Sequence, residues 1–190
     1  MLVTFEQWFA SYLEQDESEV TRLLKDETAK RFLIAWSIFE SKCFDGFVKV
    51  ESFDNYVQKI VSSTVIDCKS FTDILAHFHS RYQDVKLYNN LMHKQKSNKL
   101  QKILTKDISN LKLDEVIFFL VFVVYRYRNN IFHGNKGVES WLQFKPHIER
   151  CIRIMQILID TAKKSHNKAL NCTLLKSDVW GQHIPPLPSS

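Results

Sequence analysis

One stretch decides the fold: Val116-Ile117-Phe118-Phe119-Leu120-Val121-Phe122-Val123-Val124-Tyr125. These ten residues leave no polar face, so a helix formed by them would be buried on all sides at the centre of a bundle. A buried strand would show the same pattern. We favour a helix from Glu115 towards Asn130, because no other segment reads as a strand that could pair with it. Ten apolar residues are too few to span a bilayer, and we expect no membrane segment.

The segments around this helix show the apolar spacing of amphipathic helices. We expect helices over residues 5–24 with a break at 16–19, over 27–48, over 53–65, over 71–92 and over 144–164, and one short helix near 100–104. Helix breakers are scarce in the body of the chain, because three of the four prolines lie in the last six residues. The sequence therefore predicts an all-α fold, a helical bundle of about five to seven helices.

The length of 190 residues, with 45% hydrophobic and 25% charged residues, is ordinary for one globular domain. We expect residues 1–165 to form this domain, with its core at 27–164. Residues 166–190 are polar and then proline-rich, and are expected to form a C-terminal tail that is partly flexible.

The four cysteines form no CxxC pair and have no histidine at a zinc-finger spacing: Cys43, Cys68, Cys151 and Cys172. They are predicted to be reduced thiols that pack in the structure of a cytoplasmic protein. No motif predicts a metal site or a cofactor, and phosphate-binding loops, zinc-protease motifs and serine-hydrolase motifs are missing from the sequence.

The formal net charge is +5, which is compatible with a nucleic-acid partner. Residues 93–106 carry five lysines and no acid: Lys94, Lys96, Lys99, Lys102 and Lys106. Lys99, Lys102 and Lys106 would share one face of a helix, where they could contact the backbone of RNA. A solvated linker explains these lysines at least as well.

The apolar helix leads into Arg128-Asn129-Asn130-Ile131-Phe132-His133-Gly134. A core helix does not need a cation, two amides and an imidazole at its end. Together these groups could hold a phosphate and move a proton. In the simpler alternative Arg128 and His133 only cap the helix, since cations interact favourably with a helix C-terminus. Gly134 suits a left-handed C-cap.

This motif resembles that of the HEPN superfamily, whose ribonuclease members carry R-x(4–6)-H. Arg128 and His133 satisfy R-x4-H, and Asn129 supplies the asparagine that often follows the arginine. The full string at 128–137 is most similar to Apea-like and related stand-alone HEPN proteins, and residues 31–40 resemble the second helix of that group. In helical order the resemblance covers residues 27–164. Arg126 lies at R-x6-H and is an alternative to Arg128.

The resemblance implies a metal-independent endoribonuclease, acting as a toxin or in phage defence. His133 would take the proton of the ribose 2′-hydroxyl, and the activated oxygen would attack the adjacent phosphate and leave a 2′,3′-cyclic phosphate. Arg128 would hold this phosphate and stabilise the charge of the transition state. Asn129 and Asn130 would donate hydrogen bonds to phosphate oxygens or fix the imidazole.

Glu40 is a further candidate, because it could pair with Arg128 or Arg126 and orient the guanidinium. The alternative is an ordinary surface carboxylate paired with Lys42 or Lys49. Contacts with the RNA backbone are expected from five residues: Arg126, Lys136, Lys99, Lys102 and Lys106.

The expected partners are RNA, a second copy of the chain, and an antitoxin or other regulatory protein; no membrane is expected.

On a straight helix Arg128 and His133 would differ in direction by roughly 140°. Either the helix ends between them or a second chain completes the site. Two other classes stay open: a catalytically silent HEPN module that binds RNA, a nucleotide or a protein, and a structural helical domain whose motif only caps a helix.

Overall fold

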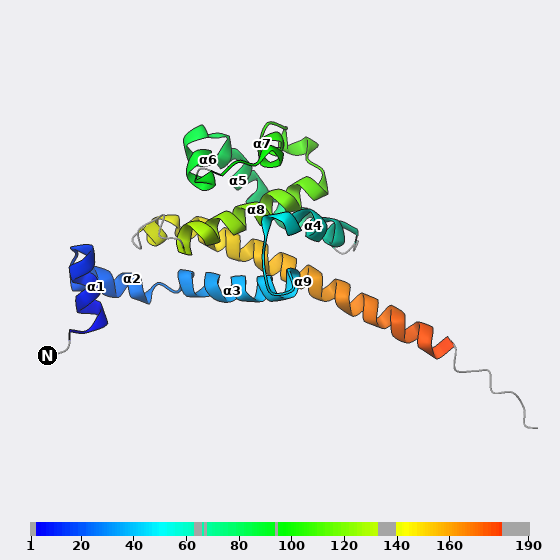
Figure 1. Ribbon diagram of the computed structural model, residues 1–190, viewed down its shortest axis with the longest axis horizontal. Helices are drawn as coiled ribbons and strands as arrows, with labels where there is room; N and C mark the ends of the chain where they lie inside the picture. The colour runs from blue at the N-terminus through cyan, green and yellow to red at the C-terminus, as the bar shows by residue number, and fades with distance from the viewer. Residues whose placement is uncertain (1–2, 63–65, 67, 94, 133–139, 180–190) are drawn as a thin grey trace, which may run out of the picture.

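The computed structural model describes residues 3–62, 66, 68–93, 95–132 and 140–179. Every regular element in these ranges is helical, which confirms the all-α bundle (Figure 1). The α-helices are α1 (Phe5–Leu13), α2 (Glu17–Lys25), α3 (Thr28–Cys43), α4 (Phe53–Ser62), α5 (Thr72–Gln83), α6 (Val85–Met92), α7 (Asn98–Leu104), α8 (Leu113–Phe132) and α9 (Ser140–Val179). Three 3₁₀ segments accompany them: η1 (Val50–Ser52), η2 (Cys68–Phe71) and η3 (Ile108–Asn110).

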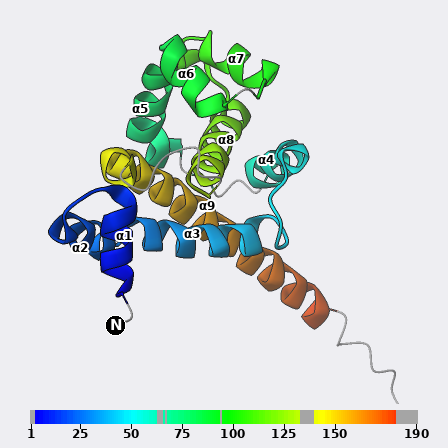
Figure 2. The same cartoon turned by 60° about the vertical axis from the view of Figure 1, so that its left-hand side comes forward.

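Helix α8 contains the apolar stretch and lies at the centre of the bundle. The side chains from Ile117 to Val124 are all buried. Helices α4, α6, α7 and α9 pack against α8, and α3 lies along α9 on the other side (Figures 1 and 2). The helical interpretation of this stretch is therefore confirmed.

The described helices outnumber the predicted five to seven, partly because the helix expected at 71–92 is two helices. The chain bends at Asp84, whose backbone is extended (φ −70°, ψ 118°) and whose carboxylate accepts a hydrogen bond from the Leu87 N–H at 2.9 Å. An aspartate in this role competes with continuation of the helix, since it satisfies a donor at the start of the next helix. The break expected at 16–19 is confirmed between α1 and α2.

Two helix ends also differ from the sequence prediction. Helix α3 ends at Cys43 rather than near Val48, because Gly46 adopts a φ of +95° and its N–H bonds back to the Glu40 carbonyl at 3.0 Å. The last helix runs over Ser140–Val179, so it extends well into the segment that was expected to be a tail. Pro146 would lie in the first turn of a helix that starts at residue 144. Because α9 starts at Ser140, Pro146 lies inside it.

A small second cluster joins α1 to α2, with Phe9, Ala10, Val20 and Leu23 buried together. Thr4 and Gln7 form a capping box at the start of α1. The Lys145 ammonium on α9 contacts the Asp26 carboxylate at 2.7 Å, which links the end of α2 to the main bundle.

Cys43 and Cys151 carry free thiols, as the sequence predicted for them. Burial raises the pKa of Cys43 to about 11 and that of the fully buried Cys151 well above its ordinary value. Both are therefore packing groups rather than nucleophiles. Within the described ranges, no helix is long and apolar enough to cross a membrane.

Helices α5 and α9 meet at a pair of histidines. The His77 Nε2 and His147 Nδ1 atoms lie 2.9 Å apart, a distance that requires one of the two nitrogens to be an unprotonated acceptor. Burial lowers the pKa of His77 below 6.5, and the nearby charges of Arg150 and Arg81 lower it further.

This pair predicts a pH dependence of stability. Because the pKa of His77 is lower in the folded chain than in the unfolded one, its contribution is complete above pH 6.5 and is lost as the pH falls through the folded pKa. We expect the free energy of unfolding, measured by urea titration, to decrease from pH 7 to pH 5. His77→Gln, which cannot titrate, should flatten this decrease. An equally steep decrease in the variant would contradict the assignment.

Candidate functional site

An open groove of about 700 Å³ lies where the C-terminal part of α8 leaves the core. Four parts of the chain line it: α3, the connection from α3 to α4, the segment that follows α6, and α8. The lining residues are Trp36, Glu40, Phe47, Val48, Lys49, Val50, Glu51, His93, Gln95, Lys96, Tyr125, Arg126, Arg128 and Asn129. The groove therefore collects residues that are up to ninety-three positions apart in the sequence, from Trp36 to Asn129.

Arg128 is held between α8 and α3. Its Nη1 donates to Asn129 Oδ1 at 3.1 Å, and its guanidinium carbon lies 5.6 Å from the centre of a Trp36 ring. A guanidinium over an indole face is a favourable cation–π arrangement. These contacts restrain a half-buried cation at the wall of the groove, where an anionic ligand can reach it.

Arg126 points elsewhere, although it also borders the groove. Its side chain is only 2% exposed, and its nitrogens donate to the carbonyls of Leu91 and Met92 at 3.0 and 2.9 Å and to Gln95 Oε1 at 2.8 Å. Carbonyls at a helix C-terminus lack donors within the helix, and Arg126 supplies them at the end of α6. Burial lowers the pKa of this guanidinium.

This geometry corrects the interpretation of Arg126 as a contact for the RNA backbone. A buried guanidinium whose donors bind the end of α6 cannot at the same time hold a phosphate. Both candidate arginines border the groove, and Arg128 is the less buried of the two.

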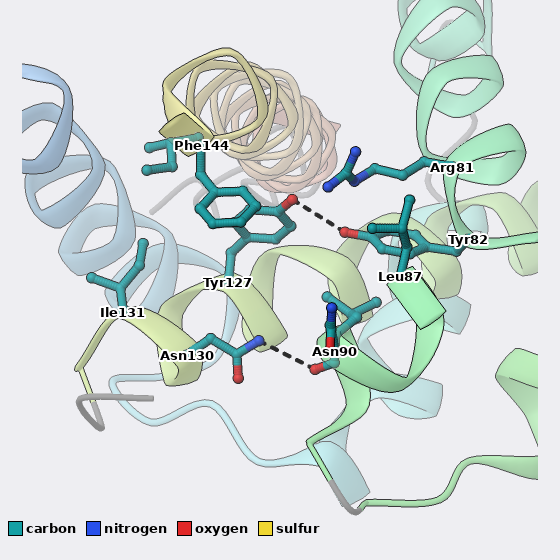
Figure 3. Close-up of a pocket in the computed structure, with 10 residues that line it drawn as sticks. Arg81, Tyr82, Leu87, Asn90, Tyr127, Asn130, Ile131 and Phe144 are labelled. Atoms are coloured by element: carbon teal, nitrogen blue, oxygen red, sulfur yellow. Dashed lines mark hydrogen bonds between the residues drawn. The ribbon is translucent and has the colours of Figure 1, made fainter. Parts of the chain in front are cut away.

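The two asparagines of the motif face different spaces. Asn129 lines the groove beside Arg128, whereas Asn130 lines a separate cavity of about 70 Å³ between α5, α6, α8 and α9. Figure 3 shows the Asn130 amide directed towards α6, where its Nδ2 donates to the Leu91 carbonyl at 3.2 Å. Asn130 therefore reinforces the same junction as Arg126 and is placed away from the groove.

Two tyrosines line the same small cavity as Asn130. The Tyr82 hydroxyl donates to the Tyr127 hydroxyl at 3.2 Å (Figure 3). Burial raises the pKa of both phenols, so both remain protonated at neutral pH. The neutral, hydrogen-bonded tyrosine pair therefore joins α5 to α8 at this cavity.

Glu40 lines the groove and fastens its wall. Its two carboxylate oxygens accept hydrogen bonds from the Trp36 indole N–H and from the Val48 backbone N–H, each at 3.1 Å. These contacts tie the chain that follows α3 to the helix itself. In the hydrogen bonds that the structure describes for Glu40, the donor is neither of the expected arginines, Arg126 and Arg128, nor Lys42 or Lys49.

The lysines proposed from the sequence are distributed differently. Lys99 pairs with Asp54 and lies 4.1 Å from the Phe118 ring centre, and Lys106 pairs with Glu115 at 2.5 Å. Both ammonium groups are thus occupied by carboxylates of the chain and lie outside the groove lining. Lys102 is exposed on α7 and is also outside this lining.

The groove residues that the sequence analysis missed include Trp36, Phe47, Lys49 as a cation of the groove, and His93. Their positions carry no motif, and only the fold brings them to Arg128. His133, Lys136 and Gly134, the expected C-cap, lie outside the described residues. Among the residues that are described, no group of three or more His, Cys, Asp or Glu side chains is arranged to hold a metal ion.

Comparison of the chain with protein-family models, curated proteins and solved structures finds no match. The HEPN interpretation therefore depends on the motif residues and on the groove that Arg128 and Asn129 line.

Arg126 and Arg128 should respond differently to the same substitution. Arg126→Met removes three hydrogen bonds of a charged group at the end of α6, and we expect it to lower the free energy of unfolding by roughly 2–4 kcal/mol. Arg128→Met removes mainly a contact with the Trp36 ring and should cost about 1 kcal/mol. Urea titration of the two variants measures both values. Equal losses would contradict the division of roles between the arginines.

Proposed function

We propose that the chain is a HEPN-type, metal-independent endoribonuclease of the cytoplasm, acting as a toxin or defence effector. The observation that carries this proposal is the position of Arg128. It is a restrained, half-buried cation beside Asn129, on the wall of an open groove, within the motif R-x4-H.

The proposed reaction needs one base and one cation. The His133 imidazole takes the proton of a ribose 2′-hydroxyl, and the oxygen bonds to the adjacent phosphorus while the bond to the 5′-oxygen breaks. The departing 5′-oxygen takes a proton from water. The products are a 2′,3′-cyclic phosphate and a 5′-hydroxyl, formed without an oxidant or cofactor. Arg128 stabilises the added negative charge on the phosphate, and Asn129 keeps the guanidinium in place. The role of His133 is inferred from the sequence motif.

The charge of the groove supports an anionic substrate. Besides the buried Arg126, which is bound to the end of α6, its lining contains three cationic side chains, Lys49, Lys96 and Arg128, and two carboxylates, Glu40 and Glu51. Positively charged grooves attract nucleic acids because binding releases counterions from the phosphates. A groove with this charge would also serve a silent RNA-binding module, so cleavage has to be measured directly.

The ribonuclease proposal is tested with purified wild type, Arg128→Ala and His133→Ala incubated with RNA in EDTA. Removal of either group should lower the cleavage rate by 10²-fold or more, since general-base and electrostatic contributions are each roughly of this size. Wild-type products should end in a 2′,3′-cyclic phosphate, and DNA of the same sequence should stay intact. Arg22→Ala, which removes an exposed arginine of α2 outside the groove, is the matched control.

The outcomes separate the alternatives. Cleavage that persists in His133→Ala would refute the proposed mechanism. RNA binding without cleavage by any folded variant would favour the silent module, and the absence of both would favour a motif that only caps a helix.

We also infer a homodimer, and a regulatory partner such as an antitoxin. A ribonuclease that acts on cellular RNA needs restraint, which explains the second partner. The dimer is supported by the outer face of α3, where Leu33, Ile34 and Ile38 are exposed although they are apolar. Contiguous exposed apolar side chains commonly mark interaction surfaces.

The dimer predicts a molar mass twice that of the chain in size-exclusion chromatography with light scattering. Ile38→Glu places a charge on the apolar face of α3, so we expect it to shift the protein towards the monomer, whereas Tyr12→Glu on α1 should not. An unchanged dimer in Ile38→Glu would place the interface elsewhere, and a monomeric wild type would refute the dimer.

A further inference from the structure

Phe47 is an exposed aromatic ring on an anchored backbone. Its side chain is 66% exposed, whereas Phe44, three residues earlier, and Val48, the next residue, are buried. The Phe47 N–H donates to the Phe44 carbonyl at 3.2 Å, and the Val48 N–H donates to Glu40 Oε1 at 3.1 Å. The backbone is therefore anchored before and after Phe47, and the large ring between these anchors lines the groove.

The surroundings of this ring are cationic. Lys49 Nζ lies 5.4 Å from the centre of the Phe47 ring, and Arg128 and Lys96 line the same groove. A half-buried aromatic side chain, Tyr125, also contributes to the wall. An exposed phenyl ring in a groove of cations offers a flat apolar face and several anion-binding groups within one site.

Single-stranded nucleic acid has the matching chemistry. Proteins that bind it combine cations, which follow the phosphates, with aromatic rings on which unpaired bases stack. A base within a duplex is already stacked and paired, so it cannot lie on an external ring. Cations outnumber carboxylates in the lining, which favours an anionic ligand such as this one over a cationic or a neutral apolar partner.

We propose that Phe47 is a stacking platform for an unpaired base of single-stranded RNA, next to the phosphate that Arg128 binds. The choice of RNA rests on the proposed ribonuclease function; the stacking site itself does not require cleavage. The site would restrict the substrate to RNA that is unpaired at the groove.

In this proposal Glu40 has a structural role at the stacking site. Its carboxylate holds both the Val48 N–H and the Trp36 indole, so it fixes the connection that carries Phe47 and the ring beneath Arg128. Glu40 is then a positioning residue for the platform, and it does not take part in proton transfer.

The test uses a fluorescein-labelled, single-stranded 2′-O-methyl oligoribonucleotide, which lacks the attacking 2′-hydroxyl and cannot be cleaved. Its affinity is measured by fluorescence anisotropy across a series of salt concentrations. Phe47→Ala should weaken binding roughly 5- to 100-fold, the range expected for loss of one base–aromatic stack. Phe47→Tyr keeps a flat ring and should bind like wild type.

Salt dependence distinguishes stacking from charge. Phe47→Ala should leave the slope of log affinity against log salt unchanged, because no phosphate contact is lost. Lys96→Ala should reduce the slope by about 0.7, the value for one phosphate of a single strand. The matched control is Phe5→Ala, since Phe5 is similarly exposed at 57% but lies on α1, outside the groove.

Three results would overturn the proposal: wild-type affinity in Phe47→Ala, equal losses in Phe47→Ala and Phe47→Tyr, or undiminished binding after the oligonucleotide is annealed to its complement. Absence of binding by wild type would also overturn it. Because the oligonucleotide cannot be cut, these results are independent of cleavage. RNA cleavage that requires His133, combined with normal binding by Phe47→Ala, would refute only the stacking site.

Discussion

The burial of α8 on all sides is the constraint on which the rest of the structure depends. Ile117, Phe119 and Leu120 are completely enclosed, and each such side chain contributes about 1.5–3 kcal/mol when it is removed from water. Neighbouring helices on one side alone cannot bury this helix, so α4, α6, α7 and α9 must surround it. On α8 polar side chains flank this apolar stretch, and those that are buried after it, such as Arg126 and Asn130, have hydrogen-bond partners. The end of α8 is therefore where Arg126, Arg128 and the two asparagines can be placed.

Two arginines separated by one residue perform different tasks because they leave the helix in directions about 160° apart. Arg126 turns towards α6, where hydrogen bonds to carbonyls offset the cost of burying its charge. The Gln95 contact also holds the segment after α6, which carries His93 and Lys96 to the groove. Arg128 turns towards α3 and the groove itself. The first arginine thus builds the wall that the second one faces.

Local periodicity allowed most helices to be predicted, since each buries one stripe and the stripe is visible in the sequence. The break at Asp84 was missed because an aspartate is read as a polar helix residue until its side chain is seen to cap the next helix. The different roles of Arg126 and Arg128 could not be predicted at all. The carbonyls that bind Arg126 are more than thirty residues away, at Leu91 and Met92. In the same way, the sequence does not distinguish the buried Phe44 from the exposed Phe47.

Arg128 connects two helices at the edge of an open groove. In the contacts that the structure describes, its guanidinium bonds to the Asn129 side chain and lies over Trp36 of α3. A free arginine side chain loses roughly 2 kcal/mol of rotamer freedom when a ligand fixes it. In this fold the Trp36 ring and Asn129 have already restricted the guanidinium, and a phosphate that enters the groove meets a cation that needs little rearrangement.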